Sequence, residues 1–239
     1  MIKIAVIPAR YASTRFPGKP IKLLSGKPII QHVYEAVVKS DIFSEVIVAT
    51  DSQIILDTVL KFGGIAELTD KNHKSGTDRI CEIAVKKKCD VVVNVQGDEP
   101  FITTKILKSV IDVFENSNVR IASLMHEITD KNEIFNPNNV KVVVDRDNYS
   151  IYFSRAPIPY KRDREGNWKA YKHLGVYAFR KEALLEFVSM KPCYLEETEK
   201  LEQLRLLSNG FKIKMIKTDY SGFGIDTPED LTEAQKKIT

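Results

Sequence analysis

A loop near the start of the chain carries side chains well suited to binding phosphate. Within the segment IPARYASTRFPGKPI (residues 7–21) they fall in a span of ten positions, at Arg10, Ser13, Arg15 and Lys19. The prolines and the glycine of its PGKP sequence keep this segment from forming a helix. Arginine and lysine are strong hydrogen-bond donors to phosphate oxygens, and their charge is opposite to that of phosphate. The segment therefore predicts a clamp for a polyphosphate.

Positive charge is concentrated in this part of the chain. Residues 1–34 contain six Lys and Arg and no Asp or Glu, whereas the other 205 residues contain 30 bases and 32 acids. The net charge of +4 therefore comes from the first segment alone. A protein that binds a long nucleic acid needs a basic surface spread over its fold. We therefore expect a small polyanion as the partner, and no nucleic acid.

Two acidic segments complement the basic loop. In VNVQGDEP (residues 93–100) an apolar strand delivers Gln96 and Asp98 at its end, and in GFGIDTPEDL (residues 222–231) Asp226 follows a short glycine-rich turn. Taken alone, Asp98 is equally suited to cap the next helix or to pair with an arginine. Two separate carboxylates beside a polyphosphate are a common way to hold Mg²⁺. Together they predict Asp98 and Asp226 as metal ligands.

This combination of groups indicates a reaction at phosphorus by direct displacement. The sequence shows no Ser-His-Asp or Cys-His constellation, and both the GxxxxGK[ST] and the GxGxxG phosphate-binding motifs are absent. Displacement at phosphorus needs little from a protein beyond alignment and charge neutralisation. The candidate catalytic residues are therefore Arg15, Lys19, Asp98 and Asp226.

The first half of the chain alternates apolar β-branched runs with helical periods. The pattern predicts strands over residues 2–9, 45–51 and 90–98, and helices over 28–40, 52–64, 76–88 and 104–117. Repeated β-α units are typical of a mostly parallel sheet with helices on both faces. In such sheets, ligands bind beyond the carboxyl ends of the strands. Both the basic loop and Asp98 follow predicted strands, so we expect them at one edge.

The second half has a different pattern. Residues 140–155 predict two strands around an Asp-Asn turn, 173–180 and 211–218 predict further strands, and 195–210 predicts a helix that ends at Gly210. Thr227 followed by Pro228 is a strong start signal for a last helix. The polar, aperiodic residues 160–172 match no element. We predict one α/β domain over residues 1–239.

Composition places the protein in the cytoplasm. The chain is 43% hydrophobic, and its three cysteines show neither CxxC spacing nor an even count, which favours a reducing compartment over disulfides or a zinc site. The opening apolar run is too short for a signal peptide, and no later one approaches the roughly 20 residues of a membrane span. We therefore expect no membrane partner.

Eight segments, in order and spread over nearly the whole chain, resemble the 3-deoxy-manno-octulosonate cytidylyltransferase (CMP-KDO synthetase) family. They are IPARYASTRFPGKP, SGTDR, VNVQGDEP, FNPNNVKVV, YFSRAPIP, HLGVYAF, LEQLR and GIDTPEDL. The resemblance implies a three-layer α/β/α sandwich with a mostly parallel mixed sheet, of the Rossmann-like nucleotide-diphosphosugar transferase type. It also implies a homodimer, Mg²⁺, and transfer of CMP from CTP to the anomeric hydroxyl of 3-deoxy-manno-octulosonate (KDO) for lipopolysaccharide synthesis.

The resemblance also implies roles for single residues. The nucleotide contacts fall on Arg10, Ser13, Arg15, Lys19, Ser75, Arg79 and Gln96, and the metal ligands on Asp98 and Asp226. The sugar contacts fall on Gln96, Arg155, His173, Tyr177, Glu202 and Gln203, within or near a sugar-binding and dimerisation portion around residues 150–180. One Arg and one His would suit the sugar's carboxylate, and amide or carboxylate side chains its hydroxyls.

For several of these residues a purely structural role stays open. Ser75 would also serve as a helix cap, His173 as a structural histidine, Tyr177 as a core residue, and Glu202 as part of a solvated acidic face. For the whole chain, the alternatives are a cytidylyltransferase for another acidic sugar, such as a sialic or pseudaminic acid, and a metal-dependent glycosyltransferase of related fold. A non-catalytic nucleotide sensor would not need Asp98 and Asp226.

Overall fold

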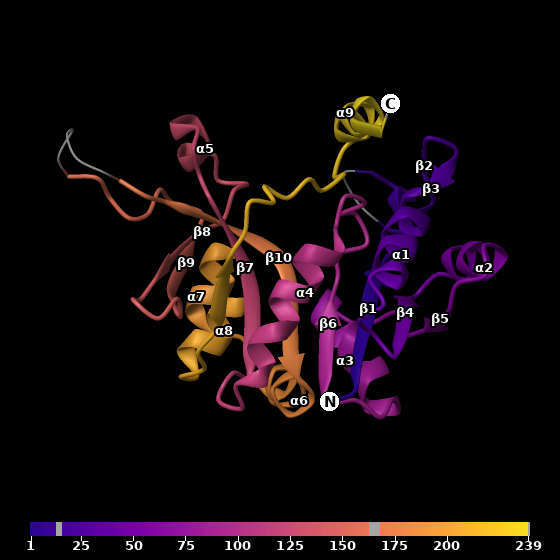
Figure 1. Cartoon of the computed structure of the whole chain (residues 1–239), viewed down its shortest axis with the longest axis horizontal. Helices are drawn as coiled ribbons and strands as arrows, with labels where there is room; N and C mark the ends of the chain where they lie inside the picture. Colours follow the sequence, from indigo (N-terminus) through magenta and orange to yellow (C-terminus); the bar gives the residue numbers. More distant parts are fainter. Residues whose placement is uncertain (13–15, 163–167, 239) are drawn as a thin grey trace. The chain divides into compact units, whose positions relative to one another are not determined.

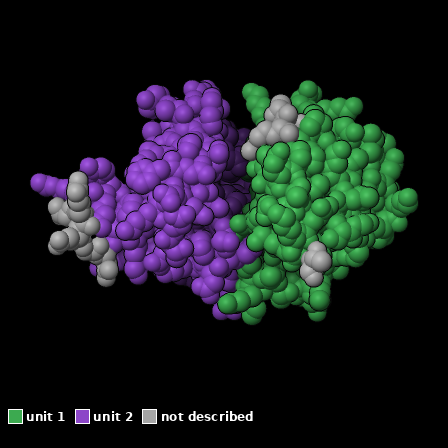
Figure 2. All heavy atoms as spheres, turned by 90° about the horizontal axis from the view of Figure 1, so that it is seen from above, with its two compact units in different colours: residues 1–108, 222–239 green, residues 109–221 purple. Residues whose placement is uncertain are grey.

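The computed structural model describes residues 1–12, 16–162 and 168–238 of the chain (Figure 1). The chain divides into two compact units, coloured separately in Figure 2: Met1–Lys108 with Gly222–Thr239, and Ser109–Ser221. The prediction of one domain over residues 1–239 stays a prediction. The strands and helices confirm an α/β fold with a mostly parallel mixed sheet flanked by helices. None of the described helices is long and apolar enough to cross a membrane.

Four parallel strands of the first unit pair in the order β6-β1-β4-β5. Their bounds are β1 Lys3–Ala9, β4 Glu45–Thr50, β5 Ala66–Leu68 and β6 Val91–Asn94. All four residues of β6 are buried, as expected for an apolar strand covered on both faces. Because β1 and β6 run parallel, the loops that follow them leave the sheet at the same edge.

The helices of the first unit begin within one residue of the predicted starts. They are α1 Ile29–Lys39, α2 Gln53–Lys61, α3 Gly76–Lys86 and α9 Pro228–Ile238. α4, Thr104–Asp112, belongs in part to each unit and ends five residues before the predicted end at residue 117. In α1 the buried residues recur at helical spacing, at Ile29, Ile30, Val33, Tyr34 and Val37. A short 3₁₀ helix, Lys19–Ile21, and a hairpin of β2 (Leu23–Leu24) and β3 (Lys27–Pro28) precede α1.

The second unit contains both parallel and antiparallel strands. They are β7 Ile121–Glu127, β8 Lys141–Val144, β9 Ser150–Ser154, β10 Tyr171–Arg180 and β11 Lys214–Lys217. β7 pairs with β11 in parallel and with β10 antiparallel, and β8 pairs antiparallel with both β9 and β10. Its helices are α5 Lys131–Phe135, α6 Lys181–Ser189, α7 Tyr194–Glu199 and α8 Gln203–Ser208, with a 3₁₀ turn at Val113–Glu115.

The predicted helix over residues 195–210 is wrong as a single element. Lys200 adopts a left-handed conformation, with φ of 54° and ψ of 47°, and separates α7 from α8. This conformation is unusual for a residue with a side chain, so the sequence gives no break signal there. The sequence analysis also left β7 and α6 unassigned. Because the first five residues of β7 are all buried, its sequence lacks the alternation that marks a half-buried strand.

Gly97, which follows β6, is a position where the backbone leaves no room for a side chain. A Cβ there would lie 2.9 Å from the carbonyl oxygen of Pro8 in β1. Pro8 cannot retreat easily because β1 is paired with strands on both sides. We predict that Gly97→Ala lowers the free energy of unfolding by about 1–3 kcal/mol, the usual range for overpacking.

The urea unfolding midpoint measures this effect. Gly224→Ala is the matched control, because a Cβ at Gly224 would meet nothing within 4 Å. Equal unfolding midpoints for the two variants would contradict the prediction, because they would mean that the backbone at Gly97 and Pro8 shifts to make room for the added Cβ at no cost in stability.

Candidate active site

Three charged side chains from distant parts of the sequence meet in the first unit. The ammonium group of Lys19 donates hydrogen bonds to Asp98 Oδ2 at 2.5 Å and to Asp226 Oδ1 at 3.0 Å. Burial alone would lower the pKa of Lys19, but the charges and hydrogen bonds of Asp98 and Asp226 outweigh it and raise that pKa above its usual value. Lys19 is therefore a firmly charged ammonium group held between two carboxylates.

The strand-end turn positions Asp98. Val95 N–H still donates to the carbonyl of Val6 in β1, and Glu99 N–H donates to Gln96 in a tight turn. The carbonyl oxygen of Asp98 itself accepts a hydrogen bond of 2.9 Å from Ile225 N–H. This backbone contact brings the residue before Asp226 directly against Asp98.

The start of α9 positions Asp226. The N–H groups of Asp226 and Thr227 both donate to the carboxylate of Asp230 at 2.9 Å, and Asp230 N–H donates back to Thr227 Oγ1 at 3.2 Å. These reciprocal bonds resemble a capping box. The predicted cap at Thr227 is thus confirmed. An apolar cluster of Phe16, Leu24, Ile29, Ile225 and Ala234 packs the same region.

An open cavity of about 400 Å³ lies at this edge of the sheet. It is lined by Pro8, Ala9, Arg10, Ala12, Lys19, Pro20, Gln96, Gly97, Asp98 and Asp226. Five predicted nucleotide or metal residues, namely Arg10, Lys19, Gln96, Asp98 and Asp226, are therefore gathered around one space. Ser13 and Arg15, also predicted for the phosphate clamp, lie outside the described residues.

The pair Asp98 and Asp226 fits a hard divalent cation. Their carboxylates already converge on one positively charged atom, the Lys19 ammonium nitrogen. Among the described residues, no group of three or more His, Cys, Asp or Glu could hold a metal ion. Mg²⁺ is commonly bound through one or two carboxylates together with water and substrate phosphates, so two aspartates are a sufficient protein contribution.

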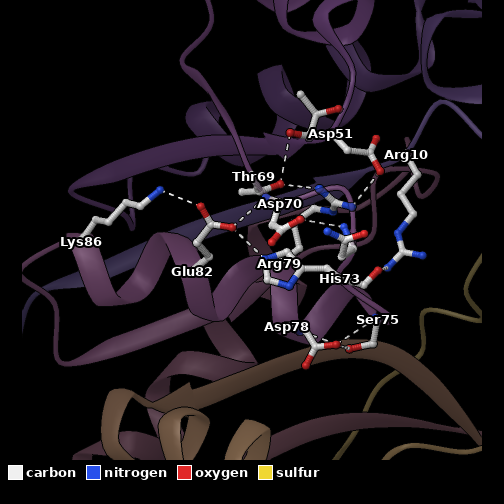
Figure 3. Close-up of polar contacts among 12 residues, drawn as sticks. Arg10, Asp51, Thr69, Asp70, His73, Ser75, Asp78, Arg79, Glu82 and Lys86 are labelled. Atoms are coloured by element: carbon white, nitrogen blue, oxygen red, sulfur yellow. Dashed lines mark hydrogen bonds and ion pairs between the residues drawn. The ribbon is translucent and has the colours of Figure 1, made fainter.

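Arg79, a predicted nucleotide residue, is fully buried, and its polar contacts are drawn in Figure 3. Its guanidinium group donates to Asp51 Oδ2 at 2.8 Å and to the hydroxyl of Thr69. Burial lowers the pKa of Arg79, and the charge of Asp51 offsets part of that effect. Because Asp51 follows β4 and Thr69 follows β5, Arg79 ties together the ends of two neighbouring strands. Its role as a nucleotide contact stays a prediction.

Ser75 caps α3, as the structural alternative for this residue expected. Its hydroxyl accepts a hydrogen bond from Asp78 N–H at 3.1 Å, and its own N–H donates to Asp78 Oδ2 at 3.0 Å. Nothing in this cap tests whether Ser75 also binds the nucleotide, so that role stays a prediction.

Glu82 organises the loop that leads to Ser75 (Figure 3). Burial would raise its pKa, but hydrogen bonds from Lys86, from Asp70 N–H and with the His73 ring lower the pKa of Glu82 to about 2. The carbonyl of His73 in turn accepts a hydrogen bond of 2.8 Å from Arg10. Arg10 of the basic loop therefore also anchors the loop before α3, a connection that the sequence analysis missed.

In the second unit, β10 places His173 and Tyr177 in a buried aromatic cluster. The His173 ring lies 5.1 Å from Phe153 and 5.3 Å from Tyr177, measured between ring centroids. Its Nε2 is 3.1 Å from the hydroxyl of Ser123. Burial lowers the pKa of His173 to about 3 and raises that of Tyr177 well above its usual value. Both side chains are therefore neutral at physiological pH, and His173 offers a hydrogen bond rather than a charge.

Glu202 and Gln203 lie at the start of α8. Gln203 is only 5% exposed, and its side-chain nitrogen has no hydrogen-bond partner among the described residues. A buried amide without a partner is uncommon in folded proteins and is well suited to receive a ligand oxygen. The sugar contacts predicted for His173, Tyr177, Glu202 and Gln203 stay predictions.

Arg155 joins three segments of the second unit. Its guanidinium group donates to the carbonyls of Glu199 at 2.8 Å and Pro137 at 3.0 Å, while its N–H donates to the Glu199 carboxylate at 2.9 Å. Lys141, which the sequence analysis did not single out, is fully buried and donates to the carbonyl of Arg155. These contacts fix the position of Arg155, whose role as the partner of a sugar carboxylate stays a prediction.

The neutral His173 gives a testable dependence of stability on pH. Because its pKa is about 3 in the folded protein and 6.5 ordinarily, the unfolded chain binds a proton between these values and the folded chain does not. Its contribution to stability is therefore complete above pH 6.5 and is lost as the pH falls toward 3, by up to about 1.4 kcal/mol per pH unit.

Urea unfolding between pH 6.5 and pH 4 measures this slope. We expect His173→Phe to lose stability less steeply than the wild type, and Tyr177→Phe, a control in the same cluster, to keep the wild-type slope. Parallel curves for all three proteins would mean that His173 takes up a proton in the folded state.

Comparison with known proteins agrees with this geometry. The family model described as cytidylyltransferase matches residues 4–215. Two proteins named 3-deoxy-manno-octulosonate cytidylyltransferase are similar over nearly the whole length of both chains. The one from Flavobacterium johnsoniae is 52% identical, with 98% of each chain covered. The one from Thermodesulfovibrio yellowstonii is 49% identical, with 99% of this chain and 98% of the relative covered.

Solved structures give the same result. A structure described as CMP:2-keto-3-deoxy-manno-octonic acid synthetase complexed with CTP superposes with a TM-score of 0.95 at 38% identity, covering 100% of this chain and 98% of the other. A 4-diphosphocytidyl-2C-methyl-D-erythritol synthase from Anaerococcus prevotii, at 16% identity and a TM-score of 0.67, shares the fold. The strand-end site, the family match and the full-length similarity together show that the chain belongs to the cytidylyltransferase family.

Proposed function

We propose that this protein transfers CMP from CTP to the anomeric hydroxyl of KDO, releasing pyrophosphate and forming CMP-KDO for lipopolysaccharide synthesis. The observation that carries the proposal is the meeting of Lys19, Asp98 and Asp226 at the cavity edge in a chain 52% identical to a protein named for this activity. The free cysteines Cys81, Cys89 and Cys193 are compatible with the reducing cytoplasm, where we place the reaction.

The first unit provides the groups that a displacement at phosphorus requires. Arg10 and Lys19 line the cavity as cationic donors for phosphate oxygens. Cytidylyltransferases catalyse a metal-dependent reaction, and we propose Mg²⁺ as the ion, held by Asp98 and Asp226. When bound, a divalent cation neutralises charge on phosphate oxygens and lowers the pKa of a hydroxyl that it contacts. No protein general base is then needed, and the aspartates and cations of the chain serve to align the phosphates.

The second unit supplies the proposed sugar contacts. Neutral donors and acceptors at His173, Tyr177 and Gln203 suit the hydroxyls of KDO. The buried side-chain nitrogen of Gln203, which has no hydrogen-bond partner in the described parts of the chain, supports this assignment. Because burial keeps His173 neutral, the positive partner of the KDO carboxylate is left to Arg155. A neutral sugar of the same size would leave such a cation unsatisfied and bind less well.

Release of pyrophosphate from CTP tests the proposal. We expect release only when both KDO and Mg²⁺ are present. Asp98→Asn and Asp226→Asn should each reduce the rate more than tenfold at saturating Mg²⁺, a loss above about 1.4 kcal/mol in transition-state stabilisation. Asp57→Asn, an exposed aspartate on α2, is the control and should keep wild-type activity.

Three results would contradict the proposal. Pyrophosphate release without any sugar, or equal rates with sialic acid and KDO, would remove KDO as the acceptor. More than a tenth of wild-type activity in either site variant would remove that aspartate as a metal ligand.

We also propose a homodimer, with contacts near β9, residues 155–159 and β10. Large apolar side chains in this part of the second unit are solvent-exposed: Phe135 by 68%, Ile151 by 60% and Tyr160 by 85%. Sedimentation at micromolar concentration should give twice the chain mass of 27.2 kDa. A constant mass near that of one chain would contradict the dimer.

A further inference from the structure

Lys19 belongs to the predicted phosphate clamp, yet its ammonium group is bonded to the proposed metal ligands. It lies 2.5 Å from Asp98 Oδ2 and 3.0 Å from Asp226 Oδ1, and its side chain is only 13% exposed. An ammonium group cannot occupy this position while a divalent cation occupies it too. The two proposed partners of Lys19, carboxylate and phosphate, therefore belong to different states of the protein.

Electrostatics explains why the protein needs a cation at this position before substrates bind. Two carboxylates that reach the same atom repel each other unless a positive charge separates them. Lys19 supplies that charge and reduces the local charge of the pair from −2 to −1. A free divalent cation must displace the ammonium group, so it loses part of the attraction that two unpaired carboxylates would offer.

The backbone around Lys19 is held in place, whereas its side chain is long enough to exchange partners. Gly18, in the left-handed region with φ of 67°, donates its N–H to Tyr11 at 3.0 Å, and Lys19 N–H donates to Phe16 at 3.1 Å. These bonds fix the Cα of Lys19 at the cavity edge. Four methylene groups then let the ammonium group move between nearby partners without any change in the loop.

We propose that Lys19 is an exchangeable counter-ion that keeps free divalent cations out of the site until a nucleotide arrives. Before binding, its ammonium group pairs with Asp98 and Asp226 and lowers their joint negative charge. When the nucleotide's phosphates and the cation enter together, the cation takes the carboxylates and Lys19 moves to the phosphate oxygens. The cation then enters with the nucleotide and not ahead of it. This inference rests on the proposed metal-dependent function.

Titration of the nucleotide-free protein with Mn²⁺, followed by electron paramagnetic resonance, tests the inference. Lys19→Met replaces the ammonium group with an uncharged side chain of similar reach. We expect it to bind Mn²⁺ at least about tenfold more tightly than the wild type, because the carboxylates lose their internal counter-ion. Lys19→Arg keeps a positive charge and should retain the weak binding of the wild type.

Two controls assign the effect to this site. Lys22→Met removes an exposed cation of the same loop, which lies 5.8 Å from the Phe16 ring centroid, and should leave Mn²⁺ affinity unchanged. Adding Asp98→Asn to Lys19→Met should abolish the gain. Circular dichroism and urea unfolding show that each variant is folded.

The outcomes are distinct. Three results would each overturn the counter-ion role. The first is a Mn²⁺ affinity of Lys19→Met equal to that of the wild type, and the second is an equal gain in affinity in Lys22→Met. The third is tight Mn²⁺ binding by the wild type without nucleotide. The titration contains neither CTP nor KDO, so failure of the proposed transfer reaction would appear in the pyrophosphate assay alone. A gain in Mn²⁺ affinity in Lys19→Met, together with a wild-type protein that shows no transfer activity, would support the counter-ion and reject the reaction.

Discussion

The hydrogen bonds between the Lys19 ammonium group and two aspartates depend on much of the first unit. They join residues that are 79 and 207 positions apart in the sequence. Parallel pairing of β1 and β6 brings the basic loop and Asp98 to one edge of the sheet. The bond from Ile225 N–H to the Asp98 carbonyl brings in the start of α9. Both the strand pairing and the Ile225–Asp98 bond are backbone contacts. The backbone fold therefore brings the three charged side chains together.

Polar contacts also hold the loops after the neighbouring strands β4 and β5 in place. Arg79, fully buried, satisfies Asp51 and Thr69 at the ends of β4 and β5. Arg10 reaches the carbonyl of His73 in the loop before α3. A buried arginine that loses its carboxylate partner is strongly destabilising. The contacts of Arg79 with Asp51 and Thr69 therefore fix the loops that follow β4 and β5. The basic residues of the SGTDR and IPAR segments are therefore structural as well as candidate ligands.

The sequence predicted those features that depend on local pattern. The apolar run before Asp98 predicted a buried strand, the Thr227-Pro228 pair predicted a helix start, and acid and base at strand ends predicted a shared site. It could not predict that Lys19 bonds to the aspartates, because side-chain direction across such separations depends on tertiary packing. Arginine and lysine are rarely fully buried, so the sequence also could not predict the burial of Arg79 and Lys141. The break at Lys200 arises from a conformation that its residue type disfavours.

The proposed function also explains why the two units use different chemistry. The cavity of the first unit carries the charged groups of Arg10, Lys19, Asp98 and Asp226, which suit a triphosphate but do little to distinguish one acceptor sugar from another. In the second unit, the proposed sugar residues Tyr177 and Gln203 are buried and His173 is half-buried, and desolvation holds His173 and Tyr177 neutral. Buried neutral donors and acceptors discriminate strongly, because a ligand that lacks the matching hydroxyl leaves them unpaired. On the proposed assignment, affinity for the phosphates and selection of the sugar would rest on separate physical interactions, and each could change without weakening the other.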